Sequence, residues 1–242
     1  MLRGPVVVVG LLGLLPLGFG QEKRWELDLE TGGTTTRYNT AAVPRDTGTM
    51  LDLRRLIGTQ SRAFGRASVL YHDSNGGTWK LLYAPFAQSG TGTLGAPANF
   101  GNRAFAAGQV NARYQFNSYR LTYRKETKGG WIIGGTLKVR DAEIRLDQGA
   151  TSASESNIGL VPLLNVYRRE SFQNGWGYEF EFDGLAGGPG RAFDISARVT
   201  RAIGNGTTAF LGYRLLEGGA DTDRVKNFAW VNYFTVGVTV SF

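Results

Sequence analysis

Apolar and polar residues alternate one by one through most of the chain from Trp25 to Phe242. The segment "GWGYEFEFDG" (residues 175–184) is the clearest case, because aromatic residues occupy four of its even-numbered positions and acidic residues occupy three of its odd-numbered positions. A period of two residues indicates a β-strand whose two faces meet different environments.

The same pattern predicts ten strands, centred on residues 24–30, 64–71, 78–84, 118–124, 131–140, 157–168, 175–184, 192–201, 208–216 and 232–242. Short hairpin turns rich in glycine or asparagine are expected at 73–77, 126–130, 172–175 and 204–206. Longer loops are expected at 35–62, 87–109, 148–156 and 217–227, with a modest one at 184–190. This alternation in length would place the short turns at one end of an antiparallel sheet.

Alternating strands also occur in soluble β-sandwiches, so the residue types on the two faces must distinguish a soluble sandwich from a membrane barrel. The polar face is densely charged, and large aromatic residues stand near strand ends on the apolar face. An even number of strands with short turns at one end is typical of transmembrane barrels. We therefore expect an all-β protein, a closed antiparallel transmembrane β-barrel of about ten strands, with eight or twelve as alternatives. Closure is required because an open sheet edge in hydrocarbon leaves backbone groups unpaired, so the last strand should pair with the first.

In such a barrel the charged face lines the lumen, and mixed signs favour ion pairing. The expected lumen charge network comprises Glu26, Asp28, Arg66, Lys80, Arg120, Arg124, Lys138, Arg140, Glu179, Glu181, Asp183 and Arg198. The expected membrane-interface aromatic residues are Trp25, Trp79, Tyr119, Tyr123, Trp131, Trp176 and Phe242.

The N-terminal segment "MLRGPVVVVGLLGLLPLGFG" has a basic residue, an apolar run and small residues at its end, which is the order of a secretory signal. We expect residues 1–20 to be a cleaved signal peptide and residues 21–242 to form the outer-membrane barrel. An uncleaved N-terminal anchor is the alternative.

The composition limits the disulfides, metal sites and partners that this protein can have. The 242 residues include 35 glycines and one histidine but no cysteine, which excludes disulfides and makes a zinc site unexpected. No metal or other cofactor is expected. The formal net charge of +7 fits contact with the phosphates of outer-membrane lipid and lipopolysaccharide, and no nucleic-acid partner is expected.

The secretory start, the alternating strands and the terminal "TVGVTVSF" resemble bacterial outer-membrane β-barrel proteins, which commonly end in phenylalanine. The resemblance implies export to the outer membrane. It also implies that the barrel-assembly machinery reads the C-terminal strand as its signal. It points to no family of known activity and to no extracellular partner.

The stretch "YHDSNGG" (residues 71–77) contains the only histidine and resembles the His-x-Ser-Asn signature of outer-membrane lipid A deacylases. In that family, a His and Ser pair with a carboxylate hydrolyses an acyl ester, which would assign His72 and Ser74 here. However, no carboxylate follows in "TWKLLYAPFAQSG", and the glycine-rich stretch favours a periplasmic hairpin turn. We therefore expect no catalytic residues. Paired acids in "GGADTD" are expected to be an ordinary polar loop.

The predicted function is a non-enzymatic barrel with a charge-plugged lumen, whose outer loops serve envelope integrity or surface interaction. The alternatives are a narrow channel for small solutes or ions and, less favoured by the residues, a lipid A-type hydrolase. Ten strands leave only a slim lumen, since open aqueous channels are typical of about 16–18 strands.

Overall fold

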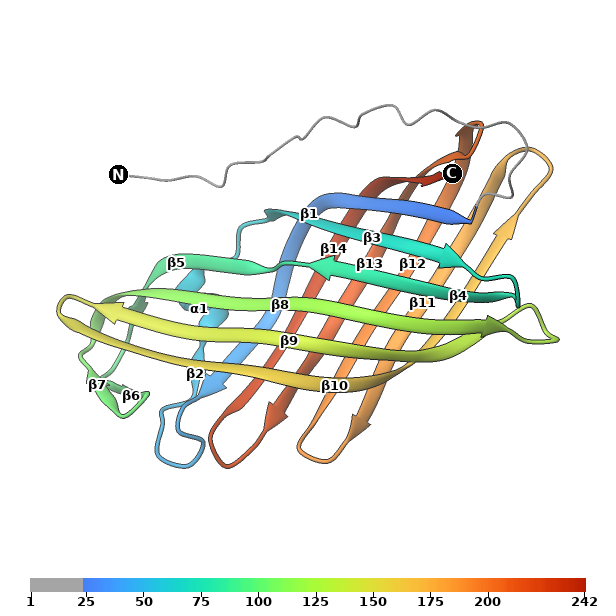
Figure 1. The fold of residues 1–242 in the computed structure, drawn as a ribbon. Helices are drawn as coiled ribbons and strands as arrows, with labels where there is room; N and C mark the ends of the chain where they lie inside the picture. Colours follow the sequence, from blue (N-terminus) through green and yellow to red (C-terminus); the bar gives the residue numbers. More distant parts are fainter. Residues whose placement is uncertain (1–23) are drawn as a thin grey trace.

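Strand β1 (Trp25–Ala42) is hydrogen-bonded on one side to β3 (Arg62–His72) and on the other to β14 (Lys226–Ser241), and the second pairing closes the sheet on itself. Figure 1 shows the resulting barrel in a computed structural model that describes residues 24–242. The expected signal peptide, residues 1–20, lies outside the described residues. At the closing seam Gly32 has a φ of +143°, and a Cβ there would collide with the carbonyl oxygen of Phe234, so the seam requires glycine.

The other elements are β2 (Leu51–Asp52), α1 (Leu53–Ile57), β4 (Gly77–Ala84), β5 (Ala87–Leu94), β6 (Ala98–Phe100), β7 (Arg103–Phe105), β8 (Gly108–Glu126), β9 (Ile132–Gln148), β10 (Thr151–Ser171), β11 (Trp176–Gly187), β12 (Gly190–Gly204) and β13 (Thr207–Asp221). Neighbouring strands are antiparallel throughout. Strands β4 and β5 pair with successive parts of β8 and together form one barrel strand, interrupted at Pro85, which has no backbone N–H to donate. The barrel therefore has ten strands, which confirms the preferred count over eight or twelve.

Several segments expected to be loops are strands instead. Residues 35–42 continue β1, residues 87–94 form β5, residues 151–156 begin β10, and residues 217–221 end β13. The expected long loop at 148–156 is a tight turn at Gly149, which has a φ of +57°. These predictions were wrong because the strands extend past the apolar band, where the alternating pattern no longer has apolar residues on its outer face.

The long connection between β1 and β3 contains β2 and the one-turn helix α1. The Asp52 side chain caps this helix by accepting a hydrogen bond from the backbone N–H of Arg55, and Gly58 ends it with a φ of +98°. Helix α1 packs against β1, β5 and β8 at the end of the barrel opposite the short turns (Figure 1). Within residues 24–242, no helix has the length and apolar character needed to cross a membrane.

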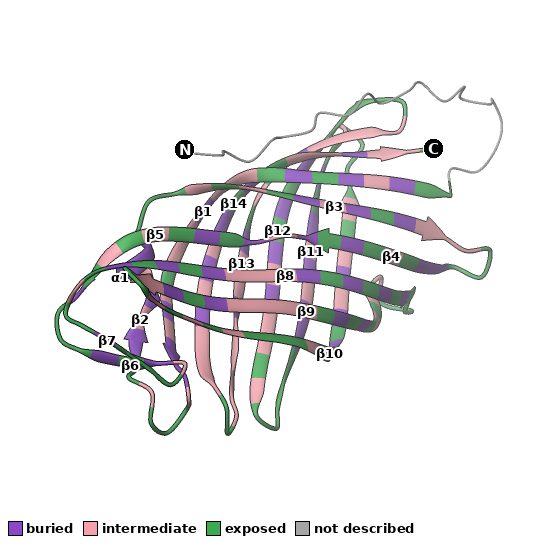
Figure 2. Cartoon of the chain, turned by 60° about the vertical axis from the view of Figure 1, so that its left-hand side comes forward, coloured by how far each residue is buried: buried purple, intermediate pink, exposed green. Residues whose placement is uncertain are grey.

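The polarity of the barrel wall inverts along its length. On β9, Thr136 and Lys138 face inward and are buried, whereas Leu137 and Val139 are exposed on the outside. Beyond Arg140 the inward positions become apolar, with Ile144 and Leu146 buried, and the outward positions become charged. We call the part between the short-turn end and Arg140 the membrane tier, and the part beyond it the outer tier. Buried and exposed residues alternate along the strands of both tiers (Figure 2).

The outer tier contains the hydrophobic core of the protein. Helix α1 and the β6–β7 hairpin contribute buried side chains to it, and Phe100 and Phe105 are almost completely inaccessible. Its principal other members are Leu53, Leu56, Phe86, Val110, Tyr114, Ile144, Leu146, Val231 and Tyr233. The outer end of the barrel is therefore filled by packed side chains.

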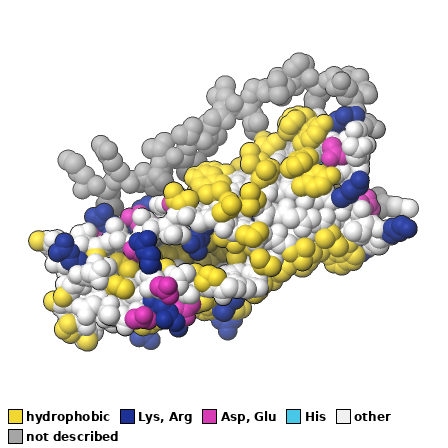
Figure 3. Space-filling view, turned by 60° about the horizontal axis from the view of Figure 1, so that its bottom comes forward, with side chains coloured by type: hydrophobic (Ala, Val, Ile, Leu, Met, Phe, Trp, Pro, Cys, Tyr) yellow, Lys and Arg dark blue, Asp and Glu magenta, His cyan; other side chains and the backbone are white. Residues whose placement is uncertain are grey.

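The outside of the membrane tier is apolar. Leu81, Leu121, Leu211 and Phe234 each expose 45% or more of their surface, although they are large hydrophobic residues. In Figure 3 the hydrophobic side chains form a band over the right-hand half of the molecule, and charged side chains gather toward its two ends. An apolar patch of this extent on a closed barrel is suited to contact with lipid.

Candidate functional site

An ion-paired cluster fills the lumen of the membrane tier. It contains seven cationic and seven anionic side chains, each within 4.0 Å of a partner of opposite charge. The cations are Arg66, Lys80, Arg120, Arg124, Arg169, Arg198 and Arg214, and the anions are Glu26, Asp28, Glu30, Glu179, Glu181, Asp183 and Asp194. We call this set the lumen network. Its formal charges balance, as burial of ionised groups requires.

Asp194 is the centre of the lumen network. Its carboxylate receives Arg214 Nη1 at 2.6 Å and Arg120 Nη2 at 2.7 Å, with Arg66 Nη2 at 3.4 Å. These residues lie on β12, β13, β8 and β3, so the contacts reach across the lumen from different sides of the wall. Glu30 on β1 continues the cluster by binding Arg214 at 3.1 Å.

On the β8–β11 side, neutral side chains complete the coordination of the carboxylates. Asp183 binds Arg120 Nη1 at 2.8 Å and also accepts hydrogen bonds from Thr136 at 2.7 Å and from Asn165 at 2.8 Å. Glu181 receives Lys80 Nζ at 2.7 Å and Arg124 at 3.0 Å. The hydrogen bonds satisfy acceptor sites that a single ion pair would leave open.

The structure places ten of the twelve predicted lumen charges in the lumen network and leaves Lys138 and Arg140 outside it. Lys138 is 2% exposed, and its Nζ lies 4.5 Å from the centre of the Phe116 ring. In the described part of the chain, no carboxylate is within ion-pairing distance of Lys138. Arg140 donates from Nη2 to Asn157 at 2.6 Å, while its buried Nε has no hydrogen-bond partner among these residues.

Sequence reasoning omitted four members of the lumen network: Glu30, Arg169, Asp194 and Arg214. Glu30 and Asp194 share the polar face of their strands with predicted members, so the two-residue period could have included them. Arg214 is flanked by apolar residues in "GYRLL", and Arg169 lies in "YRRE" beside a second arginine, so neither stood out.

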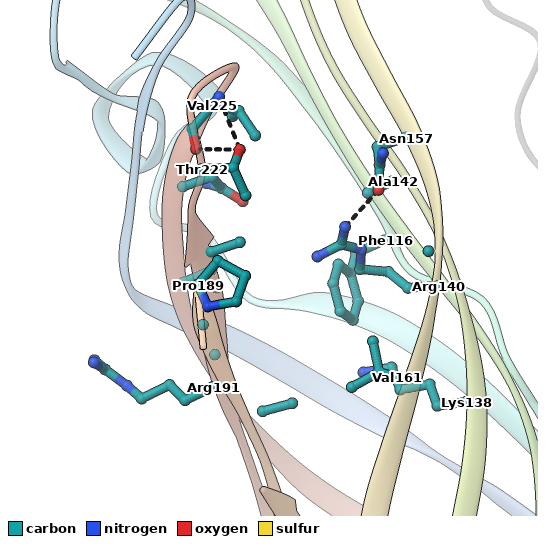
Figure 4. Close-up of a pocket in the computed structure, with 18 of the residues that line it drawn as sticks. Phe116, Lys138, Arg140, Ala142, Asn157, Val161, Pro189, Arg191, Thr222 and Val225 are labelled. Atoms are coloured by element: carbon teal, nitrogen blue, oxygen red, sulfur yellow. Dashed lines mark hydrogen bonds between the residues drawn. The ribbon is translucent and has the colours of Figure 1, made fainter. Parts of the chain in front are cut away.

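An apolar cavity of about 360 Å³ lies at the junction of the two tiers. One wall carries Phe116, Lys138 and Arg140, and the opposite wall carries Pro189 and Val225 from two hairpin ends (Figure 4). Most of the remaining lining is also apolar, including Phe86, Tyr114, Ile144, Leu160, Val161, Leu185, Leu216 and Val231. This volume is at the lower end of the range for small-molecule sites.

Lys138 and Arg140 supply the charge of the cavity that no carboxylate balances. The side chain of Arg191 points away from the cavity in Figure 4, and its guanidinium binds Glu217 at 2.8 Å. Two further lining carboxylates are paired with arginines outside the cavity: Glu155 with Arg224 at 3.2 Å and Glu143 with Arg113 at 3.7 Å. The cavity is therefore cationic and mostly apolar.

His72 lies beside a carboxylate that its sequence neighbourhood did not reveal. Its Nε2 is 3.4 Å from Glu26 Oε1 across the β1–β3 pair, and its Nδ1 is 3.1 Å from Thr78 Oγ1. The sequence that follows His72 offers no carboxylate to orient it, but the folded sheet supplies Glu26 because β1 pairs with β3. Glu26 is also bound by Arg169 at 3.1 Å, and Thr78 is buried. Ser74 lies in the exposed turn after β3.

Six of the seven predicted interface aromatic residues, namely Trp25, Trp79, Tyr123, Trp131, Trp176 and Phe242, lie near the short-turn end of the barrel. Tyr119 is farther along β8, where its ring stacks on Tyr83 at 5.2 Å. The backbones of Trp25 and Phe242 exchange hydrogen bonds of 3.1 and 2.9 Å at the seam. The named residues thus form one aromatic girdle and not two.

A closed wall, an apolar exterior band, an aromatic girdle and a charged interior are together suited to a lipid bilayer and to no aqueous compartment. The chain is a closed transmembrane β-barrel of the outer-membrane type. Among residues 24–242, no group of three or more His, Asp or Glu side chains is arranged to hold a metal ion.

Comparisons with known proteins found similarity among solved structures only. No protein-family model matches the sequence, and no curated protein matches it. Among solved structures, the barrel is similar to the outer-membrane protease OmpT of Escherichia coli, with 9% identity over 90% of this chain and 97% of that chain and a TM-score of 0.49. It is also similar to Ail, the attachment invasion locus protein of Yersinia pestis, with 11% identity over 90% and 99% of the two chains and a TM-score of 0.39. Neisserial surface protein A gives 11% identity over 90% and 97%, with a TM-score of 0.35. At these identities the likeness concerns the fold alone.

Proposed function

We propose that this outer-membrane barrel conducts neither solutes nor ions and acts without catalysis, by binding at its outer tier. The observation that carries the proposal is the lumen network, in which each of fourteen buried or partly buried charged side chains is ion-paired within one narrow barrel. An ion could cross only by displacing such pairs, and leaving one buried charge without its partner costs about 3–5 kcal/mol.

The environment of His72 supports a role without hydrolysis. A serine or threonine nucleophile must be accessible to substrate and hydrogen-bonded to its base. Thr78 Oγ1 meets His72 Nδ1 at 3.1 Å but is buried, and Ser74 is exposed in a turn. Glu26, which would orient the histidine, is bound by Arg169. These contacts support a structural role for His72 in the lumen.

Two partners follow from the surface of the barrel. We propose that lipopolysaccharide phosphates contact the outer tier, where Arg55 and Arg224 leave 82% and 79% of their side chains exposed. We also propose that the barrel-assembly machinery recognises β14 and the terminal Phe242. The Phe242 ring is 44% exposed on the apolar exterior, where another protein can reach it.

Conductance across a planar lipid bilayer tests the plugged lumen. The wild-type protein should give no discrete openings after insertion is verified by labelling of an outer-loop residue. A triple variant that empties the centre (Arg120→Ser, Asp194→Ser, Arg214→Ser) separates the two obstacles in the lumen: conductance by this variant assigns the block to the lumen network, whereas a silent variant assigns it to the packed core of the outer tier. Discrete openings of the wild-type barrel would instead establish the alternative function, a narrow channel.

A further inference from the structure

We propose that the cavity at the junction of the two tiers binds a single-chain amphipathic anion, an acyl chain with a carboxylate or phosphate head, which enters sideways between β10 and β11. The head would lie at Lys138 and Arg140, and the chain would lie against the apolar walls. This inference extends the binding role proposed above by naming the class of ligand.

The barrel closes through every pair of neighbouring strands, but the β10–β11 pairing stops short of the outer end, beside the cavity. Strand β10 pairs with β9 along Thr151–Tyr167, but its pairing with β11 covers only Leu164–Ser171. The two strands diverge toward the outer end in Figure 1. Residues 151–163 of β10 therefore form an edge that faces β11 without pairing to it. Strand β11 turns instead into β12, with which it pairs as far as Gly187.

The edge of this gap is apolar. Leu160 and Ile158 on β10 expose 63% and 76% of their surface, and Leu185 on β11 exposes 48%. Leu185 continues the inward-facing positions Glu181 and Asp183 of its strand, yet the gap leaves it accessible. Leu160 and Leu185 also line the cavity, so the apolar surface is continuous from the outside of the barrel to its interior.

The gap begins at a depth that acyl chains of the outer leaflet reach. It starts at the pair Leu164 and Gly184, and Gly184 is eight residues beyond Trp176 on β11. At about 3.3 Å per residue and a tilt of about 40°, this is about 20 Å from the aromatic girdle, within an apolar band about 25 Å tall. An acyl chain could therefore enter the gap without leaving its hydrocarbon environment.

The charges of the cavity indicate an anionic head. The lumen network balances its own seven positive and seven negative groups, which leaves Lys138 as an additional buried cation. Arg120 and Arg140 repel Lys138, whereas the carboxylates of Asp194 and Asp183 attract it from a distance but are bound directly by Arg120. Lys138 is 2% exposed, its Nζ lies 4.5 Å from the centre of the Phe116 ring, and no carboxylate within residues 24–242 is at ion-pairing distance. Holding a cation in such a site is costly, and an anion in the cavity would lower this cost. The unpartnered Nε of Arg140 would provide a second donor.

Photolabelling tests the proposal directly. The full-length protein in phosphatidylcholine nanodiscs would be irradiated with a long-chain fatty acid that carries a diazirine in its chain, and labelled peptides would be mapped by mass spectrometry. We expect labels on the cavity walls, in peptides that contain Leu160, Val161 or Leu216. The double variant Lys138→Met, Arg140→Gln should lose about tenfold or more of this labelling, because charge-assisted hydrogen bonds to the head are lost. Ala142→Trp, which fills the cavity with an indole, should abolish it.

Matched controls separate the site from general surface charge. Lys128→Gln removes an exposed cation in the β8–β9 turn at the short-turn end, and Arg103→Gln removes an exposed cation of the outer tier; neither residue lines the cavity, and both variants should leave labelling unchanged. Heat-dependent gel mobility verifies that each variant is a closed barrel. Labelling that survives both Lys138→Met, Arg140→Gln and Ala142→Trp would overturn the proposal, whatever the conductance experiment shows.

Two further probes distinguish the sources of the ligand. A lysophosphatidic acid with the same photoreactive chain should label the site if the natural ligand is a membrane phospholipid, and the fatty acid alone should label it if the ligand is a free carboxylate. Labelling by both supports the shared chemistry of chain and anion. Equal labelling by a neutral monoacylglycerol would refute the role of Lys138 and Arg140.

Discussion

The Nη1 atom of Arg214 on β13 lies 2.6 Å from Oδ1 of Asp194 on the neighbouring strand β12, and only 3% and 2% of the two side chains are exposed. Asp194 also binds Arg120 at 2.7 Å. Asp194 is thus a hub, a single carboxylate that binds arginines from two other strands. It joins strands that are distant in the sequence and stabilises one cross-section of the barrel.

Replacement of Asp194 by Asn should therefore destabilise the folded barrel strongly. The change leaves Arg214 and Arg120 short of a counter-charge in a buried site, for which we expect a loss of about 3–5 kcal/mol in the free energy of unfolding. Urea unfolding from phosphatidylcholine vesicles, followed by tryptophan fluorescence, measures it. The control is Asp147→Asn, since Asp147 pairs with Arg145 at 2.9 Å but both side chains are more than one third exposed. That variant should change stability by less than about 1 kcal/mol. Equal effects of the two variants would contradict the central role of Asp194.

Replacement of Lys138 by Met should instead increase the free energy of unfolding. The thioether keeps the apolar contact with Phe116 and removes a buried cation that lacks a direct anionic partner, so the ligand-free barrel should gain about 1–3 kcal/mol. The same unfolding experiment, on protein refolded from urea without added lipid anions, measures the gain. In the Asp194→Asn background the gain should be larger, because Asp194 no longer attracts Lys138. A loss of stability in the ligand-free protein would show that Lys138 has a partner within the barrel.

Replacement of Phe100 by Ala should loosen the outer tier and leave the membrane tier folded. Phe100 is fully buried in the outer core, and removing such a ring costs about 3–5 kcal/mol where the cavity cannot collapse. Hydrogen exchange should increase at residues 95–107, while heat-dependent gel mobility persists. Met50→Ala is the matched control, because Met50 is 50% exposed in the same outer region. Loss of the closed barrel in Phe100→Ala would show that the two tiers unfold together.

Hydrogen exchange of the loop at residues 43–50 should begin to rise as the pH falls below about 4, the ordinary range of an aspartate. Arg45 Nε lies 2.5 Å from Asp221 Oδ1 near the β13–β14 turn, and this hydrogen bond, with the nearby Lys226, holds the pKa of Asp221 below its usual value. A depressed pKa means that the contact stabilises the loop above the unfolded pKa and is lost as pH falls through the folded one. Hydrogen exchange at residues 43–50, corrected for its intrinsic pH dependence, measures the change.

Two variants test whether Asp221 causes this acid dependence. Asp221→Asn should raise exchange of the loop at neutral pH and remove its acid dependence. Asp46→Asn, which alters the other and more exposed partner of Arg45, should preserve the acid dependence. The hypothesis fails if the loop of the Asp221→Asn variant still opens on acidification.

The membrane tier could be predicted from the sequence because a strand there has a period of two residues and two very different faces. The pattern of "GWGYEFEFDG" alone assigns Glu179, Glu181 and Asp183 to one face and the aromatic residues to the other. The ten strands and the closed barrel follow from the same pattern, because lipid forbids an open edge. In the outer tier the inward positions are apolar and the outward positions are polar or charged. Segments such as residues 151–156 therefore do not show the pattern of the membrane tier and were not predicted as strands.

Only the tertiary structure decided which charges meet. Periodicity assigns Lys138 and Arg120 to the inner face alike, but the register across the lumen gives Arg120 two carboxylates and gives Lys138 an aromatic ring. The proximity of Glu26 to His72, the hub at Asp194 and the gap between β10 and β11 have the same origin. A strand's own sequence determines the face on which a side chain lies, whereas its partners depend on how distant strands are aligned when the barrel closes.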